Sequence, residues 1–145
     1  MSTPTLPPAF TTPPPTVRDL WRSRRDDPRV GLRFEDQAWT WREHDQAARD
    51  RAALLISLRV PGEPFHVGVL LDNVPEFSFL LAAAAYAGAT VVGVNPTRRG
   101  AELERDLLHS DCRILITEDR YAPLLDGLAL PVSPRSRSIL SRRTC

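Results

Sequence analysis

Lysine is absent from this chain of 145 residues, and all nineteen basic residues are arginine. An arginine does not easily lose its proton, and it does not offer a phosphate the compact point charge of a lysine. These 145 residues therefore cannot by themselves catalyse a reaction that requires a lysine. Eighteen acidic residues nearly balance the arginines, so the net charge is +1 and the composition does not indicate a nucleic-acid partner.

Cysteine, histidine and glycine-rich phrases are also scarce. Cys112 and Cys145 have no spacing typical of a disulfide or a metal site, and we interpret Cys112 as a small buried core residue. His44, His66 and His109 form no i, i+4 pair, so we expect no metal site. No serine lies in a G-x-S-x-G phrase, and neither G-x-G-x-x-G nor G-x-x-x-x-G-K-[ST] occurs. The sequence therefore predicts no catalytic, cofactor-binding or metal-binding residue.

Residues 77–94 carry no charge and approach the length of a membrane span. Pro75 and Glu76 favour a helix start, Gly88 favours its end, and β-branched residues follow, so we predict a buried helix and a strand without a transmembrane segment. Residues 1–15 hold six prolines and do not match a secretory signal. We expect a disordered leader over 1–15 and a cytoplasmic protein.

Two helices and a hairpin are predicted before residue 60. Thr16 is placed to cap a helix over 17–25, and the β-rich runs 30–34 and 38–40 flank a turn.

Thr40 and Glu43 match the capping box of a longer helix over 41–59. Its polar residues Arg42, Glu43, Asp50 and Arg51 are expected to face water. The residues of its expected buried stripe are Trp41, Ala48, Ala52 and Leu55.

Short apolar strands alternate with helices from residue 66 onward. The runs 66–71, 90–94 and 113–117 are short and mostly apolar, as strands covered on both faces are. The helices expected next to them start after Asn73, at about Ala101 and after Asp119, with Asn73 and Asp119 as N-caps. This alternation predicts an α/β domain over 16–130, with a mostly parallel sheet and flanking helices.

The loop at 95–100, Asn-Pro-Thr-Arg-Arg-Gly, joins a strand to a helix, where phosphates often bind. It has one glycine, and Pro96 removes a backbone donor, so a nucleotide site is not favoured. We expect Arg98 and Arg99 to be exposed or to pair with Glu102 and Glu104.

The other strand–helix junction contains Asp72 and Asn73. Both are capping residue types, and a carboxylate at this place would repel a phosphate. We interpret the pair as structural.

Residues 131–145 break the pattern. The stretch is rich in arginine and serine and has no hydrophobic period, so we expect a disordered tail that adds no core element. Because an arginine-only composition indicates a GC-rich gene, we hypothesise that residues from a shifted reading frame begin around Ser133.

Four phrases follow one another in a familiar order: Thr40–Asp45, Val67–Phe77, Ala84–Pro96 and Cys112–Thr117. As an ordered set they resemble the N-terminal region of the adenylate-forming acyl-CoA synthetases, and the form of residues 95–100 is most similar to fatty-acid–CoA ligases of the FadD type. The resemblance spans roughly residues 30–120. It implies part of the N-terminal AMP-binding subdomain of a longer, apparently truncated enzyme.

The resemblance implies a two-step ligase that uses ATP, Mg²⁺ and CoA. A fatty carboxylate attacks ATP to give an acyl-adenylate and pyrophosphate, and the CoA thiol then displaces AMP. The family's phosphate loop and lysines would lie beyond residue 120, so we expect the chain to be inactive alone and to bind none of these cofactors tightly.

Two other interpretations stay open. The same α/β unit could be a non-catalytic binding or interaction module, with apolar surface that supports self-association. An unrelated flavodoxin-like domain would need a phosphate loop at the end of its first strand, which 70–77 does not supply.

Overall fold

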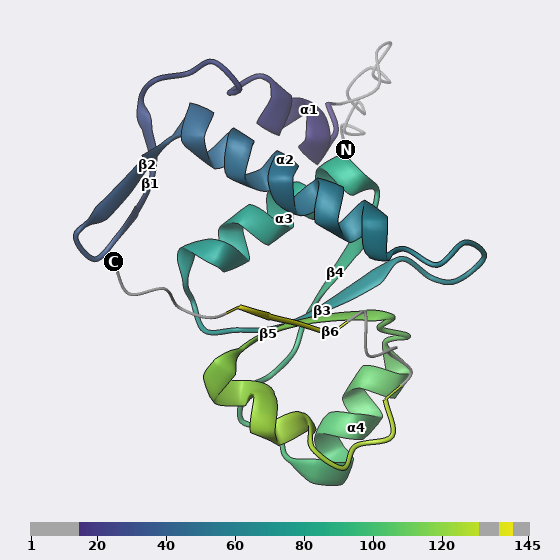
Figure 1. The fold of residues 1–145 in the computed structure, drawn as a ribbon. Coiled ribbons are helices and arrows are strands. Elements are labelled where there is room, and N and C mark those ends of the chain that lie inside the picture. The colour runs from purple at the N-terminus through teal and green to yellow at the C-terminus, as the bar shows by residue number, and fades with distance from the viewer. Residues whose placement is uncertain (1–14, 131–136, 141–145) are drawn as a thin grey trace, which may run out of the picture.

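The computed structural model describes residues 15–130 and 137–140, and Figure 1 shows their arrangement. In chain order the elements are α1 (Val17–Arg22), β1 (Val30–Phe34), β2 (Gln37–Thr40), α2 (Trp41–Leu58), β3 (His66–Leu70), α3 (Pro75–Ala87), β4 (Thr90–Gly93), α4 (Gly100–His109), β5 (Ile114–Glu118), the 3-10 helix η1 (Asp119–Leu125) and β6 (Arg137–Leu140). The predicted alternation of helices and strands is confirmed.

The central sheet has four strands in the order β4-β3-β5-β6, and all of its pairs are parallel. Val67 of β3 pairs with Val91 on one side and with Ile114 on the other, so β3 and β5 are the inner strands. A separate antiparallel hairpin, β1-β2, leads into α2. The predicted class, α/β with a mostly parallel sheet and flanking helices, is confirmed.

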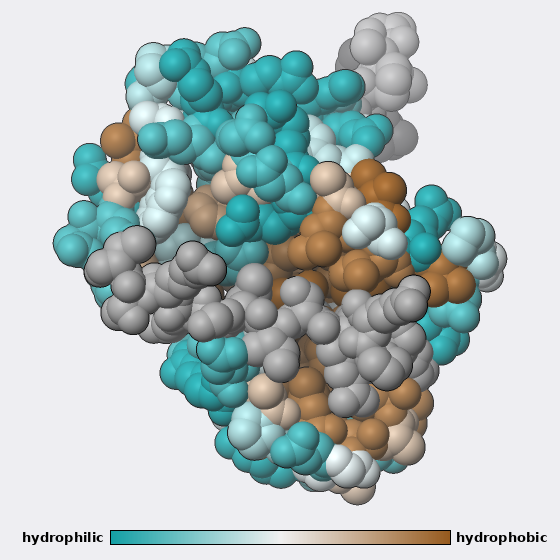
Figure 2. Space-filling model, viewed as in Figure 1, coloured by the Kyte–Doolittle hydropathy of each residue, from teal (hydrophilic) through white to brown (hydrophobic). Residues whose placement is uncertain are grey.

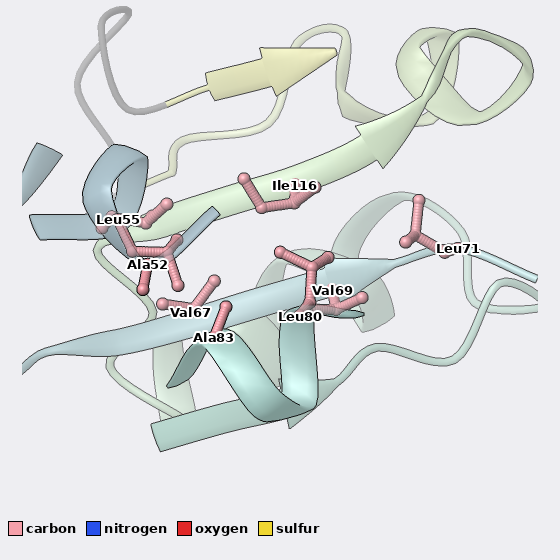
Figure 3. Packing of buried hydrophobic residues seen from close by; sticks show 9 residues of the cluster. Ala52, Leu55, Val67, Val69, Leu71, Leu80, Ala83 and Ile116 are labelled. Atoms are coloured by element: carbon pink, nitrogen blue, oxygen red, sulfur yellow. The ribbon is translucent and has the colours of Figure 1, made fainter. Parts of the chain in front are cut away.

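The sheet is covered on both faces. On one face, side chains of α2 and α3 meet β3 and β5 in a cluster that Figure 3 shows from close by. On the other face, Leu103 and Leu107 of α4 and Leu125 of η1 pack with Leu70 and Leu115. Every residue of β5 is buried, as expected for a strand with two covered faces. Each fully buried Leu, Ile or Val contributes about 1.5–3 kcal/mol, so these layers are the main source of stability.

The capping box predicted at the start of α2 is present. The Glu43 amide donates to Thr40 Oγ1 at 3.2 Å, and the Thr40 amide donates to Glu43 Oε2 at 2.7 Å. Trp41, the first residue of α2, is half-buried against the hairpin, while Ala48, Ala52 and Leu55 are buried as expected.

Two predicted N-caps are wrong. Helix α3 starts at Pro75, which places the N-cap at Val74 in an extended conformation and leaves Asn73 outside the helix. The residue before a proline favours an extended conformation. Pro75 therefore places the N-cap at Val74, one residue after Asn73, which the residue types favoured. At η1 the N-cap is Glu118, and Asp119 is already inside the helix.

The charge-free stretch divides as predicted. Helix α3 ends at Gly88, which adopts the left-handed conformation with φ of 73°, and β4 follows at Thr90. Among the residues that the structure describes, no helix is both long and apolar enough to cross a bilayer.

One expectation about the C-terminal stretch is wrong. Arg137–Leu140 form β6, which lies parallel to β5, because backbone pairing to a sheet edge does not require an apolar sequence pattern. Residues 1–14, 131–136 and 141–145 lie outside the described residues. For these segments the predicted leader, the tail and the shifted reading frame stay predictions.

The glycine in β1 provides a test of how α2 is seated. A Cβ at Gly31 would lie 2.4 Å from Trp41 Cδ2, whereas a Cβ at Gly93 in β4 would have only Phe77 Cζ at 3.9 Å. We expect Gly31→Ala to lower the free energy of unfolding by about 2 kcal/mol, since the indole ring would have to move. Urea unfolding measures the change, and Gly93→Ala is the matched control with a loss below about 1 kcal/mol. Equal losses would contradict this packing.

Candidate functional site

The carboxyl ends of β3 and β5 are the place where this fold would bind a ligand. The chain leaves β3 toward α3 on one face of the sheet and leaves β5 toward η1 on the other. In open parallel sheets, ligands bind where neighbouring strands send their connections to opposite faces. The candidate site is therefore the junction between the loop after β3 and the start of η1, which follows β5 directly.

Four side chains meet at this junction. Tyr121 Oη donates to Asp72 Oδ1 at 2.5 Å, and the Arg120 guanidinium forms an ion pair with the same carboxylate. Arg120 Nε also donates to Glu118 Oε2 at 2.7 Å. Thr117 lies just inside, where its hydroxyl donates to the Leu70 carbonyl at 3.2 Å. These contacts tie the end of β3 to the end of β5.

This arrangement does not fit a nucleotide. Asp72 and Glu118 contribute two negative charges and Arg120 contributes one positive charge, so the junction repels phosphate groups. The guanidinium is already engaged by both carboxylates. Neither the loop after β3 nor the start of η1 contains a glycine that would let backbone amides approach an anion. We call this set of contacts, among Asp72, Glu118, Arg120 and Tyr121, the clamp, because it joins the loop after β3 to the start of η1.

The loop at 95–100 does not fit a phosphate either. Arg98 pairs with Glu102 at 3.1 Å, as predicted, and Arg98 Nε lies 3.4 Å from Asp106 Oδ2. Arg99 Nη1 donates to the Pro96 carbonyl at 2.6 Å. The predicted partner Glu104 instead accepts a hydrogen bond from the Ala129 amide at 2.8 Å. The loop is a connector held by its own side chains.

His44, which the sequence analysis considered only as a metal ligand, lies within hydrogen-bond distance of a serine that it did not name. His44 Nε2 of α2 is 2.9 Å from Ser78 Oγ of α3, and the imidazole is buried with 1% of its surface exposed. A nucleophilic serine needs a base whose second nitrogen is oriented by a third group. Within the described part of the chain, His44 Nδ1 has no hydrogen-bond partner. The pair therefore lacks the geometry of a hydrolase site.

Asp45, next to His44, is the centre of a second buried network. Its carboxylate accepts a hydrogen bond from Arg49 Nε at 2.8 Å and another from the Tyr86 hydroxyl, which joins α2 to α3. Burial and the bond to Asp45 raise the pKa of Tyr86 to about 12. The helical stripe correctly predicted Ala48 and Ala52, but it gave no reason to bury a carboxylate, because its partner Tyr86 is 41 residues away.

Arg51 is also placed differently from its prediction. It was expected to face water, yet its guanidinium donates through Nε and Nη2 to Glu76, at 2.8 and 2.6 Å, and thereby links α2 to α3. The long side chain reaches the neighbouring helix from the edge of the buried stripe.

The remaining sequence candidates stay apart. His66 Nδ1 lies 2.9 Å from the Ser110 carbonyl oxygen, and His109 ends α4. Cys112 is buried as predicted, and burial raises the pKa of its thiol. In residues 15–130, no group of three or more His, Cys, Asp or Glu side chains could hold a metal ion.

Comparison with known sequences gives a consistent family. The chain matches the AMP-binding enzyme family over residues 20–143, a range that includes β6. It is 49% identical over 118 residues to the steroid-22-oyl-CoA synthetase of Rhodococcus jostii, which covers 81% of this chain and 21% of that protein. It is 42% identical over 114 residues to the medium/long-chain-fatty-acid–CoA ligase FadD17 of Mycobacterium marinum, which covers 79% of this chain and 23% of that protein. The chain thus spans about a fifth of the length of these relatives.

Solved structures show the same fold. A putative long-chain-fatty-acid CoA ligase from Rhodopseudomonas palustris superposes with a TM-score of 0.76 over 90% of this chain and 34% of that chain, at 20% identity. A Mycobacterium tuberculosis fatty acyl CoA synthetase gives 0.71 over 86% and 26%, at 24% identity. The arrangement of helices around this sheet is therefore that of the N-terminal part of such enzymes.

The clamp at this junction can be tested by removing the Asp72 carboxylate, which both Tyr121 and Arg120 contact. We expect Asp72→Ala to lower the free energy of unfolding by about 1 kcal/mol, because the hydrogen bond from Tyr121 is lost and a partly exposed ion pair contributes little more. Asp119→Ala, which removes an exposed aspartate in the first turn of η1, is the control with a change within about 0.5 kcal/mol. Urea unfolding distinguishes them, and a neutral Asp72→Ala would contradict the clamp.

Proposed function

Because the chain belongs to the AMP-binding enzyme family, we propose that it forms an N-terminal scaffold layer of an acyl-CoA ligase and has no ligase activity by itself. The observation that carries this proposal is the combination of a covered parallel sheet with a carboxyl edge that repels phosphate. No lysine occurs among the 145 residues to hold ATP or the reacting carboxylate.

The proposed reaction belongs to the whole ligase. A carboxylate oxygen attacks the α-phosphorus of ATP, the bond to the bridging oxygen of pyrophosphate breaks, and an acyl-adenylate forms. The CoA sulfur then attacks the acyl carbon and AMP leaves. ATP, Mg²⁺ and CoA would be bound by groups outside the described residues, and their use points to the cytoplasm as the location.

The proposed substrate class is a fatty or other hydrophobic acyl acid. FadD17, at 42% identity, supports a fatty acid, whereas the steroid-22-oyl-CoA synthetase, at 49% identity, supports a carboxylate on a steroid side chain. Both classes present a carboxylate on a large apolar body, so both belong in the test.

ATP–pyrophosphate exchange tests the absence of activity directly. We expect the purified 145-residue chain, offered long-chain fatty acids or a steroid C22 carboxylate, to give no exchange above background. A full-length relative such as the Rhodococcus jostii synthetase is the positive control under the same conditions. Exchange by the pure chain that depends on added carboxylate would overturn the proposal.

The alternative function is a non-catalytic module that binds its own copies or another part of a ligase. Exposed apolar side chains around the C-terminal half of α2 favour it, and Figure 2 shows hydrophobic surface gathered there. The residues are Leu54, Ile56 and Val60.

Sedimentation velocity tests this surface. We expect the average mass to rise with concentration, because association buries apolar side chains that water now contacts. Ile56→Glu should reduce the association, whereas Leu108→Glu, an exposed leucine of α4 on the other side of the sheet, should leave it unchanged. A monodisperse monomer at all concentrations would exclude self-association through this surface.

A further inference from the structure

Helix α1 is attached to the rest of the domain through very few contacts. None of its residues is buried, and Val17 and Leu20 are exposed. Trp21 stacks on the His44 imidazole with ring centroids 4.6 Å apart and planes inclined by 4°. Arg18 donates a hydrogen bond to the Tyr86 carbonyl at the end of α3. The Trp21 ring also lies 5.6 Å, centroid to centroid, from the Trp41 ring, so this indole joins α1 to two rings of α2.

We propose that protonation of His44 releases α1 from α2 and α3, so that α1 is a pH-sensitive clasp on this domain. The helix would be closed when the imidazole is neutral and open when it is an imidazolium. This inference does not depend on ligase activity.

The surroundings of His44 suit a neutral ring. Phe79 of α3 lies edge-on to the imidazole at 5.0 Å, and Trp41 of α2 lies at 6.0 Å, so aromatic rings surround it together with Trp21. Nε2 has its partner in Ser78, but Nδ1 has none in the described part of the chain. An imidazolium carries a proton on both nitrogens, so one N–H would stay buried without an acceptor.

The charges near His44 do not compensate a proton there. Asp45 is the nearest carboxylate, but Arg49 Nε lies 2.8 Å from it and Arg25 Nε lies 3.9 Å away. Tyr86 also donates to it.

One further ion pair and two contacts between an arginine and an aromatic ring face the same region. Arg51 on α2 pairs with Glu76 on α3 and lies over the Phe79 ring at 5.2 Å. Arg24, in the turn after α1, lies over the Trp41 ring at 5.9 Å. Protonation would add a positive charge to a region that already holds four arginines and two carboxylates.

The balance of forces gives the sign of the effect. A ring face attracts a cation, which favours the imidazolium, but burial of a charge without a full set of acceptors costs more. Burial accordingly lowers the pKa of His44, and the charge of Asp45 and the polar backbone of His44 itself oppose this only in part. In the open state the imidazole meets water and regains its ordinary pKa of about 6.5. The closed state is then fully favoured above about pH 6.5 and is lost as the pH falls toward the lowered pKa.

Release of α1 need not disturb the rest of the domain, because the turn after α1 has its own hydrogen bonds to α2. The Trp41 amide donates to the Arg29 carbonyl at 3.0 Å, and the Arg42 amide donates to the Asp27 carbonyl at 3.1 Å. These bonds hold residues 27–29 against α2 without any contribution from α1. Release of α1 would expose Trp21 and the ring of His44 while the sheet stays intact.

Hydrogen–deuterium exchange of the full 145-residue chain tests the clasp. After correction for the intrinsic exchange rate, we expect protection of the α1 amides to fall about tenfold between pH 7.5 and pH 5.5, while β3 keeps its protection. The variant His44→Gln keeps a partner for Ser78 and cannot be protonated, so its α1 protection should not depend on pH. His109→Gln removes an exposed histidine and should behave as the unchanged chain does.

Each other outcome overturns the proposal. Equal α1 protection at both pH values, an equal loss in His44→Gln, or a loss of protection in β3 at the same pH would do so. Should His44→Gln fail to fold by circular dichroism, NMR titration of the unchanged chain decides. The His44 ring signals must then titrate below about pH 6.5, with the midpoint of the α1 signals. A His44 midpoint at or above about pH 6.5 would contradict the clasp.

Discussion

The burial of β3 and β5 on both faces is the constraint on which the rest of this structure depends. Their side chains point alternately toward α2 and α3 on one face and toward α4 and η1 on the other. Since neither strand has a wet face, neither can exist without both helical layers, and the short connections between strands and helices follow from that need. The same constraint positions the loops after β3 and β5 side by side at one edge, where Asp72, Arg120 and Tyr121 tie them together.

A sheet edge of this kind can serve as a binding site or as part of a frame, and the chemistry of its loops decides between the two. Here the junction supplies two carboxylates, one engaged guanidinium and no glycine, so its charges pair with each other, which supports the proposal that this edge does not receive an anion. The family relationship agrees with a structural role for this chain, because the chain spans only about a fifth of the length of the relatives whose names describe ligases. The polar residues buried between α2 and α3 belong to the frame as well, since Asp45 and Arg51 each join the two helices.

Local signals in the sequence predicted most of the elements. The capping box of Thr40 and Glu43, the apolar runs of the strands and the glycine at position 88 all act within a few residues, and each was found where it was expected. Asn73 was assigned the wrong role because the effect of Pro75 on the preceding residue shifted the cap to Val74. The site was harder to predict. Asp72 and Tyr121 are 49 residues apart, and only the lateral order β4-β3-β5, which sequence order does not give, brings them together. His44 and Asp45 were missed for the same reason, because the partners that allow their burial come from α1 and α3.

Calorimetric titration of the isolated chain with Mg·ATP, and with a non-hydrolysable acyl-adenylate analogue, tests the central claim that these residues form a frame without a nucleotide site. The structure predicts no saturable heat for either ligand, because Arg120 is held by Asp72 and Glu118, and Arg98 is paired with Glu102 and Asp106. Tight, saturable binding that disappears in Arg120→Gln would show that this edge does receive phosphate, and would contradict the account.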